Sequence, residues 1–367
     1  MASSALSASA LFLKQHAERI GNSLAYRLNF PRGQYHGLPA PQPKPNGQMV
    51  PCRTAVFDPD QLSRVTACGF GRELHSEVMK LTATAFLEVP ADVFELGPAT
   101  VAGGMVFSQH GHYAISPQRP GFSQIRNAEP IDSPVVLANS AQGLKFFGHW
   151  VADDTTVFEH YRDHPGLLSL PRPVWKDAAA YEQLFDHDWH EVAAFSTPSL
   201  TLVRELGFNL SKAERFTRLR DRMRGKIAPV QPGRIVFIRR GGSGANRDIV
   251  NWPELEPVLE QAGITILTPE DDTGEFIRQL LDASLIISVE GSQMCHAQYG
   301  IRPGGAVLVL QPPDRFYNPH HEWTRLMDIA YGFVVGRTAE GGFTIDADEL
   351  LSMADRLLTM TGNLPEV

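Results

Sequence analysis

The C-terminal part of the chain alternates strand-like and helix-like segments with a regularity that few folds permit. From Gly233 onward, short and almost wholly apolar runs are separated by amphipathic, helix-like stretches, and the runs are RIVFIRR, ITILTP, LIISVEG, AVLVLQPP and YGFVVG. Buried strands that alternate with helices are typical of a parallel, doubly wound sheet covered on both faces. This pattern predicts a Rossmann-like domain over residues 229–340. A terminal helix within 341–367 is expected to pack back on the N-terminal domain.

The N-terminal part is less regular and predicts a second α/β domain. An amphipathic helix and a Pro/Gly-rich segment indicate an N-terminal helix and linker over residues 1–52. Residues 53–228 then form the second domain. Within it, FELGPATVAGGMVFSQHGHYAIS predicts short antiparallel hairpins, because Gly-Gly and His-Gly turns separate apolar pairs. PVVLANS predicts a buried strand.

Composition excludes several classes of protein. The 367 residues suffice for two domains, and 43% hydrophobic with 20% charged residues is typical of a folded globular chain. The net charge of −8 disfavours a nucleic-acid binder, which needs a broad basic surface. Three scattered cysteines are too few for a disulfide framework or a zinc cluster. No apolar run is long enough to span a membrane, and the N-terminus lacks the basic segment of a signal peptide. We therefore expect a cytoplasmic protein.

Arginines gather where the first of the regular strands ends. In IRRGGSGANRDIVNWPEL, Arg239 and Arg240 close the strand, and Arg247 and the helix-capping Asn251 follow a glycine turn. Permanently charged, forked donors around a glycine loop at a helix start suit a diphosphate. The alternative is a solvated basic turn with surface salt bridges. The glycines do not fit the dinucleotide pattern GxGxxG, which disfavours a hydride-transferring enzyme.

A second candidate lies where LIISVEG turns into the next helix. Gly291 allows a ligand to approach the backbone, and the amide of Ser292 stands at the helix start. Glu290 is placed to accept a hydrogen bond from a ribose or sugar hydroxyl. Its alternative role is to cap the helix or to pair with an arginine.

Two further strand ends carry polar residues. Glu270 closes the strand ITILTP, and Glu275 lies in the first turn of the next helix; both are candidate donor-site residues, whereas Asp271 and Asp272 are interpreted as cap residues. The pair His320-His321 is interpreted as ordinary loop residues, because adjacent histidines do not readily chelate from one helix face. We predict no metal site and no bound cofactor.

A histidine and an aspartate four residues apart mark the N-terminal half. In FFGHWVADDTTVFEHY, His149 and Asp153 share one face if the segment is helical. An imidazole oriented by a carboxylate can act as a general base. The alternative is a buried histidine that serves only the core.

These segments, taken in order, resemble glycosyltransferase family 61. The family pattern HWxxD is similar to His149, Trp150 and Asp153, and its pattern SRxxxxxRxIxNExEL is matched by Arg239, Arg247, Ile249, Asn251 and Leu255. SVEGSxxxHA, with His296, stands where the family has its glycine motif, usually HGAxxxN. The resemblance covers about residues 90 to 335.

The resemblance implies a GT-B-like fold of two facing Rossmann-like domains with a cleft between them. It implies an inverting, metal-independent transfer from a UDP-sugar, which is a substrate and not a cofactor, to a glycan or another hydroxyl acceptor. Residues 53–228 would form the acceptor side and residues 229–340 the donor side. Arg239 and Arg247 would hold the diphosphate, amides at Gly291-Ser292 would assist, and His149 or Asp153 would deprotonate the acceptor. A bacterial-type enzyme of surface or capsular polysaccharide is the expected member.

Departures from the family pattern leave some questions open. The family continues as HWxxDxLPRL, whereas this chain has Thr156-Val157-Phe158-Glu159. The donor sugar and the acceptor are therefore open, as is the existence of a homodimer. Two rival functions stand beside transfer: a nucleotide-diphosphate-sugar epimerase or hydrolase, and a non-catalytic nucleotide-sugar-binding subunit.

Overall fold

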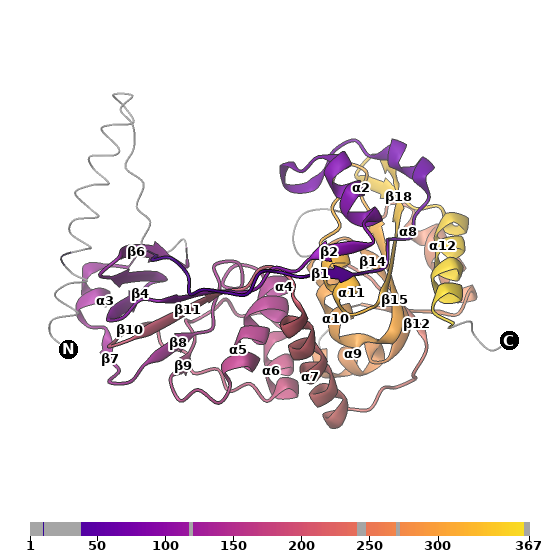
Figure 1. The fold of residues 1–367 in the computed structure, drawn as a ribbon. Coiled ribbons are helices and arrows are strands. Elements are labelled where there is room, and N and C mark those ends of the chain that lie inside the picture. Colours follow the sequence, from indigo (N-terminus) through magenta and orange to yellow (C-terminus); the bar gives the residue numbers. More distant parts are fainter. Residues whose placement is uncertain (1–9, 11–37, 117–119, 241–246, 269–271, 363–367) are drawn as a thin grey trace. The chain divides into compact units, whose positions relative to one another are not determined.

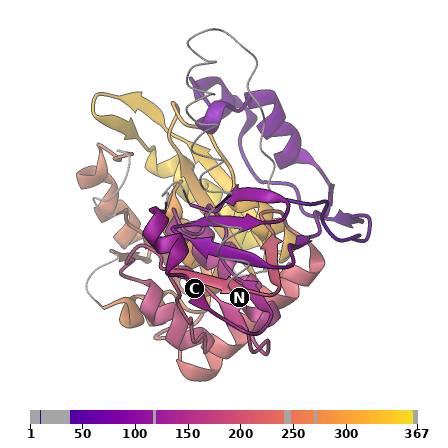
Figure 2. The same ribbon diagram turned by 90° about the vertical axis from the view of Figure 1, so that its left-hand side faces the viewer.

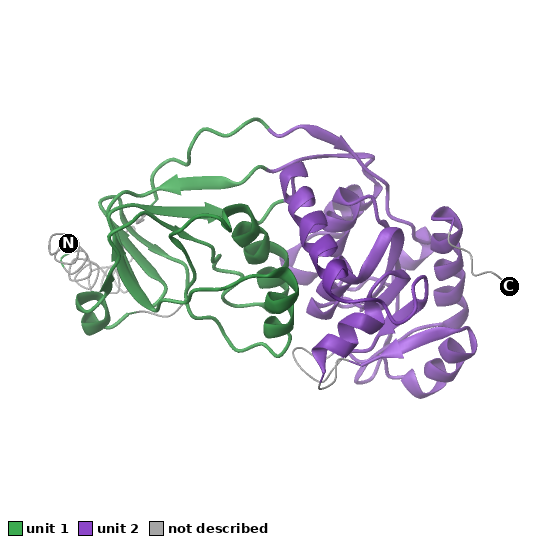
Figure 3. Ribbon diagram, turned by 90° about the horizontal axis from the view of Figure 1, so that it is seen from below, with its two compact units in different colours: residues 1–46, 90–207 green, residues 47–89, 208–367 purple. Residues whose placement is uncertain are grey.

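The computed structural model describes Ala10 and residues 38–116, 120–240, 247–268 and 272–362. The chain is of the α/β class, as predicted, and divides into two compact units (Figure 3). Figures 1 and 2 show its elements from two directions. Unit 1 consists of Met1–Asn46 and Pro90–Gly207, and unit 2 of Gly47–Val89 and Phe208–Val367.

Unit 2 contains the predicted Rossmann-like sheet, in which all five strands are parallel. The spatial order is β13-β12-β14-β15-β16. The strands are β12 (Ile235–Ile238), β13 (Ile264–Leu267), β14 (Ala283–Val289), β15 (Ile301–Gln311) and β16 (Ala330–Val335). Because β13 lies on one side of β12 and β14 on the other, the chain reverses its winding direction between β12 and β14. In doubly wound sheets such a switch point is where ligands bind, at the carboxyl ends of the strands.

Helices cover both faces of this sheet. Figure 1 shows α12 on one side of the strands and α9 and α10 on the other. The helices of unit 2 are α2 (Leu74–Thr82), α7 (Leu210–Lys226), α8 (Trp252–Gln261), α9 (Thr273–Leu280), α10 (Ala297–Gly300), α11 (His320–Leu326) and α12 (Ala347–Met360). The predicted helix SQMCHAQYG is split into a 3₁₀ segment, η4 (Ser292–His296), and the short α10.

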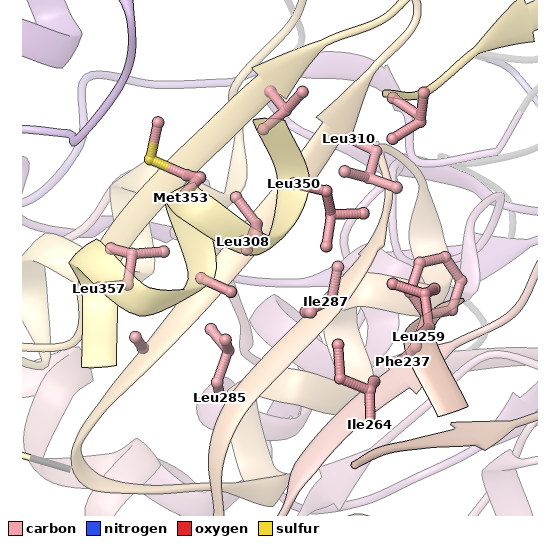
Figure 4. Packing of buried hydrophobic residues seen from close by; sticks show 14 of the residues in the cluster. Phe237, Leu259, Ile264, Leu285, Ile287, Leu308, Leu310, Leu350, Met353 and Leu357 are labelled. Atoms are coloured by element: carbon pink, nitrogen blue, oxygen red, sulfur yellow. The ribbon is translucent and has the colours of Figure 1, made fainter. Parts of the chain in front are cut away.

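The terminal helix α12 packs on the sheet of unit 2. Asp346 caps its first turn, and its apolar face contacts β14, β15, β16 and α8. Leu350 and Leu357 lie in one buried cluster with Leu285 and Leu308 of the sheet (Figure 4). Each fully buried leucine of this kind contributes about 1.5–3 kcal/mol. The apolar stripe of this helix completes the core of its own unit, and the part of the predicted N-terminal domain that α12 contacts, around Val56 and Arg64, belongs to unit 2 as well.

The segment 47–89 also belongs to unit 2, so the predicted boundary at residue 53 is wrong. Backbone hydrogen bonds join Val56 to Tyr331 and Phe333 of β16. Arg64 donates to both carboxylate oxygens of Glu349 on α12, at 2.6 Å each. Besides α2, the segment forms the pair β1 (Met49–Pro51) and β2 (Ala85–Leu87) and the 3₁₀ turns η1 (Pro59–Arg64) and η2 (Gly69–Gly71).

The predicted boundary at 228 moves as well, since α7 lies in unit 2. The hairpin β17 (Arg337–Ala339) and β18 (Gly342–Thr344) completes this unit.

Unit 1 combines antiparallel and parallel strands in two sheets. The antiparallel hairpins β4-β5-β6 confirm the predicted ones, and β8, β9 and β11 are parallel neighbours. The sheet orders are β6-β5-β4-β10-β7 and β3-β11-β8-β9. The strands are β3 (Asp92–Glu95), β4 (Ala99–Ala102), β5 (Met105–Ser108), β6 (Gly111–Ala114), β7 (Glu129–Pro130), β8 (Val135–Leu137), β9 (Leu167–Leu168), β10 (Ala194–Thr197) and β11 (Leu200–Arg204). The helices are α3 (Phe122–Arg126), α4 (Phe147–His149), α5 (Thr155–Tyr161) and α6 (Ala178–Phe185), with the π-helical segment η3 (Trp150–Asp154) between α4 and α5. Over the described residues of both units, no helix has the length and apolar character needed to cross a bilayer.

Candidate active site

The switch point of the unit 2 sheet brings charged residues together. β12 and β14 are neighbours whose ends are paired, Ile238 opposite Ser288. Arg240 follows β12 and Glu290 follows β14. The adjacent strand β15 leads into the loop that carries Arg315. Three neighbouring strands thus deliver their C-terminal residues to the edge where an open parallel sheet binds its ligand.

Glu290 is the buried centre of this cluster, with 4% of its surface exposed. Arg247 donates both to its carboxylate and to its backbone carbonyl. Arg315 Nε lies 3.8 Å from Glu290 Oε2. Burial raises the pKa of Glu290, and the charges of Arg247, Arg315 and Arg240 partly counteract that rise. Three guanidinium groups thus surround one carboxylate, an arrangement that favours a further anion.

Gly291 is the point on which two of these guanidinium groups converge. Its φ of 154° lies in the region that favours glycine. A Cβ at this position would lie 2.9 Å from Arg240 Nη1 and 3.0 Å from Arg247 Nη1. Burial lowers the pKa of both arginines, and the charge of Glu290 opposes that effect. A bound anion would favour the charged form of both arginines, as Glu290 does. Two guanidinium groups beside a backbone that carries no side chain therefore suit a phosphate group.

His320 holds the backbone of Gly291 in place. The histidine pair predicted to lie in a loop is instead buried at the start of α11. Trp323 Nε1 donates to His320 Nδ1 at 3.2 Å, so His320 Nε2 carries the proton and donates to the Gly291 carbonyl, 3.1 Å away. Burial lowers the pKa of His320 to about 4, which keeps the ring neutral at pH 7. The tryptophan three positions later, Trp323, is the sequence signal that could have indicated an oriented ring on a helix.

Arg315 is the residue of the cluster that the sequence reasoning missed. Its loop is fixed by Gln311, whose side chain donates to the Tyr317 carbonyl at 2.9 Å and accepts from the Tyr317 amide at 3.1 Å. The available signal was its place just after the strand AVLVLQPP, since ligands bind at the carboxyl ends of such strands.

Arg239, by contrast, lies over an aromatic ring. Its guanidinium carbon is 5.1 Å from the ring centroid of Trp252. Asn251, predicted to bind the donor, uses its side-chain amide on both groups of the Ile345 backbone, at 2.9 and 3.1 Å. It therefore ties α8 to the loop before α12. Sequence reasoning placed Arg239 at the diphosphate, whereas Arg240 and Arg315 are the arginines that join Arg247.

The remaining predicted donor residues are placed as follows. Glu275 contacts Arg278 and Gln279 of its own helix, at 2.7 and 2.9 Å. Asp272 caps that helix, as predicted. Glu270 and Asp271 lie outside the described residues. Ser292 is exposed at the start of η4, next to Gly291.

Within the described parts of the chain, no three side chains of His, Cys, Asp or Glu form a group that could hold a metal ion.

The predicted His149–Asp153 pair is confirmed in unit 1. His149 Nδ1 lies 2.7 Å from Asp153 Oδ2. The His149 side chain is 46% exposed, whereas that of Asp153 is 6% exposed. A buried carboxylate that engages Nδ1 fixes the tautomer of the ring and leaves Nε2 as the nitrogen that can take a proton from a ligand. The exposure of His149 disfavours a purely structural role in the core.

The helix widens at the pair. The η3 segment is π-helical, and the Thr155 amide donates to the Trp150 carbonyl five residues earlier. Single π-helical turns are rare and frequently occur at functional sites.

The wider turn accompanies two successive buried carboxyl groups, Asp153 and Asp154. Burial, with a smaller contribution from the charge of Asp153, raises the pKa of Asp154 well above its ordinary value. Burial thus favours the neutral form of the Asp154 carboxyl, and the neighbouring Asp153 is the carboxylate that contacts His149.

Asp154→Asn is expected to make the free energy of unfolding less dependent on pH. A carboxyl with a raised pKa in the folded state stabilises the fold below its unfolded pKa, about 3.9, and this stabilisation is lost as the pH rises through the folded value. An amide has no such proton to lose. Relative to the original chain, the variant should gain stability as the pH rises from about 4, by at most ~1.4 kcal/mol per pH unit.

Urea unfolding of both proteins between about pH 4 and about pH 8 measures this difference. Asp163→Asn, at an exposed position, is the control and should follow the original chain at every pH. Parallel pH profiles for the Asp154→Asn variant and the original chain would contradict a raised pKa of Asp154 in the folded state.

Comparison with known proteins gives one family and two solved structures. Residues 147–308 match the family model Glycosyltransferase 61. Among curated proteins, none matches the chain. Two structures of the E. coli heptosyltransferase WaaC, one with ADP-2-deoxy-2-fluoro heptose and one with ADP, are similar at 12% identity and a TM-score of 0.30. These matches cover 61% and 63% of this chain and 99% of the WaaC chain. The family match spans both the His149–Asp153 pair and the Arg240, Arg247 and Glu290 positions, and so supports the resemblance to glycosyltransferase family 61 over these residues.

Proposed function

We propose that the chain is an inverting glycosyltransferase that moves a sugar from a UDP-sugar to a hydroxyl group of a glycan or another acceptor. The observation that carries the proposal is the convergence of Arg240 and Arg247 on Gly291 at the switch point of the sheet. A nucleoside diphosphate presents the charge and the oxygen geometry that two forked donors over a bare backbone accept. The family match over residues 147–308 supports transfer as the reaction. The acceptor we propose is a surface or capsular polysaccharide assembled in the cytoplasm of a bacterium.

In this reaction a single displacement occurs at the anomeric carbon. The acceptor oxygen forms a bond to that carbon as the bond from the carbon to the β-phosphate oxygen breaks, and the electron pair leaves with UDP. His149 Nε2 takes the proton of the acceptor hydroxyl, and Asp153 stabilises the imidazolium that forms. Arg240 and Arg247 stabilise the charge that develops on the leaving diphosphate.

We further propose that the transfer does not depend on a divalent metal ion. In many phosphate sites Mg²⁺ or Mn²⁺ neutralises the charge of the leaving group. Here the guanidinium groups of Arg240, Arg247 and Arg315 gather around Glu290, beside the proposed position of the diphosphate. They supply positive charge at fixed positions, which is what a developing diphosphate requires.

A two-step experiment tests the proposal. Thermal shift with UDP-, ADP- and GDP-sugars first identifies the donor, and we expect a UDP-sugar to raise Tm. Transfer is then measured as release of the free nucleotide with a panel of glycan acceptors, in buffer with EDTA and again with added manganese. We expect acceptor-dependent release that EDTA does not abolish.

The same assay separates the rival functions. An epimerase or hydrolase would convert the nucleotide sugar at full rate without an acceptor. A non-catalytic binding subunit would raise Tm with a nucleotide sugar but release no nucleotide with any acceptor. Release that EDTA abolishes and manganese restores would contradict metal independence alone, and the absence of any nucleotide binding would contradict the proposed function as a whole.

A further inference from the structure

An exposed phenylalanine in a left-handed backbone conformation stands beside the arginine cluster. Phe70, in the turn η2, has φ 57° and ψ 30°, and 71% of its surface is exposed. A bulky residue rarely adopts this conformation, because its Cβ approaches the following carbonyl. Exposure of a large apolar ring to water is unfavourable as well. Neither feature benefits the fold of the turn, which has glycine on both sides of the ring.

The turn is nevertheless held rigidly against the loop that carries Arg315. The Gly69 amide donates to the Phe316 carbonyl at 3.0 Å, and the Phe316 amide donates back to the Ala67 carbonyl at 2.9 Å. The Thr66 amide adds a bond of 2.7 Å to the Pro313 carbonyl. A strained conformation persists only when the surrounding structure determines it, as these bonds do, and such positions cluster at functional sites.

A single side chain connects the Phe70 ring to the arginine cluster. The guanidinium carbon of Arg315 lies 4.8 Å from the centroid of the Phe70 ring, and Arg315 Nε lies 3.8 Å from Glu290 Oε2. Tyr317 supports the ring from another side, with the two centroids 5.0 Å apart in an edge arrangement. The ring is therefore fixed by Arg315 and Tyr317 while most of its surface stays open. All of these residues belong to unit 2.

We propose that Phe70 is the stacking platform for the base of the nucleoside diphosphate whose phosphates bind Arg240 and Arg247. This inference rests on the proposed function. A nucleoside diphosphate bound at Gly291 carries a flat aromatic base one ribose away from its phosphates, and a flat, rigid π surface beside the arginines suits it. Aromatic stacking tolerates any base, because every base has a π face. The strained backbone at Phe70 is retained because it presents the ring at this position. Phe70 and Arg315 both lie outside residues 147–308, so the family match assigns neither of them a role.

Calorimetry with UDP and with inorganic pyrophosphate tests the platform. Phe70→Gly removes the ring while fitting the left-handed backbone, and Phe70→Ala removes it without adding flexibility. Both variants are expected to bind UDP about 5- to 100-fold more weakly, with pyrophosphate affinity unchanged, because pyrophosphate has no base. Phe70→Tyr keeps the ring and should bind UDP like the original chain. Met79→Ala, at an exposed apolar position on α2, is the matched control and should change neither affinity.

Three results would overturn the inference. If the Phe70→Gly variant bound UDP as tightly as the unaltered chain, the ring would contact no base. An equal loss for UDP and pyrophosphate would show that the ring acts only by holding Arg315. A loss seen with a UDP-sugar but not with UDP would place the sugar on the ring instead. In each of these cases the unaltered chain still binds UDP, so the proposed function stands; if the unaltered chain binds neither UDP, ADP nor GDP, both proposals fail together.

Discussion

Replacing His149 with alanine is expected to lower kcat about 100- to 10,000-fold, the contribution that a positioned general base typically makes. The affinity for UDP should stay within about twofold, because a base that acts on the acceptor hydroxyl contributes nothing to diphosphate binding. The expectation rests on the 2.7 Å contact between His149 Nδ1 and the buried Asp153 carboxylate, and on the exposure of the ring. Such a ring is oriented by the carboxylate and is open to a ligand.

Two further variants define the role of the pair. Asp153→Asn should lower kcat less than His149→Ala if the carboxylate only orients the ring, and as much or more if the carboxylate is itself the base. His160→Ala, at an exposed position on the adjoining helix, is the control and should keep the original rate. Initial rates at saturating donor, with UDP affinity measured by calorimetry, separate catalysis from binding. If both His149→Ala and Asp153→Asn turn over like the original chain, the base lies elsewhere, and Glu290 is the next candidate.

The unit 2 sheet could be predicted from the sequence because its pattern is local. A strand buried on both faces is a continuous apolar run, as β14 is, with all seven residues buried. The first two runs are each followed by an amphipathic helix, α8 and α9, whose apolar positions recur with the helical period. The residues at the ends of such strands were identifiable for the same reason, since strand order along the chain already places their carboxyl ends at one edge.

The assignment of individual arginines could not be predicted, because it depends on which way a side chain points. Successive residues at the end of a strand point to opposite faces. Arg239 accordingly lies over Trp252, whereas its neighbour Arg240 reaches Gly291. A one-residue difference in where a strand ends would exchange their roles, and strand boundaries are the least certain feature of a sequence-based reading.

The return of residues 47–89 to unit 2 had no local signal either. Val56 bonds to the backbone of β16, and Arg64 binds Glu349, which lies 285 positions later in the chain. Such pairings are set by the tertiary fold and leave no periodicity in the segment itself. The same holds for Phe70 and Arg315, which are far apart in sequence and are brought together by backbone bonds between two irregular loops.

Replacing Arg247 with alanine is expected to weaken UDP binding about 10- to 100-fold, because a charge-assisted contact to a diphosphate is worth roughly 1.5–3 kcal/mol. Arg247 is the arginine most deeply engaged in the cluster: its side chain is 10% exposed and contacts Glu290, and a Cβ added at Gly291 would lie 3.0 Å from its Nη1. Its removal also takes away the charge that contributes most to keeping the buried Glu290 ionised. The variant should therefore lose thermal stability as well as affinity, so binding and folding must be measured separately.

The double variant Arg247→Ala with Glu290→Gln separates these two effects. Glutamine removes the buried charge that Arg247→Ala leaves without its main partner, so the double variant should regain stability but should not regain UDP affinity. Arg239→Ala is the matched control, since this neighbouring arginine lies over Trp252, and its UDP affinity should change by less than about threefold. Calorimetry with UDP and thermal unfolding of all four proteins decide the matter. Recovery of UDP affinity in the double variant would mean that Arg247 serves the fold and not the diphosphate; a larger loss in Arg239→Ala than in Arg247→Ala would place the phosphates at Trp252 instead of Gly291.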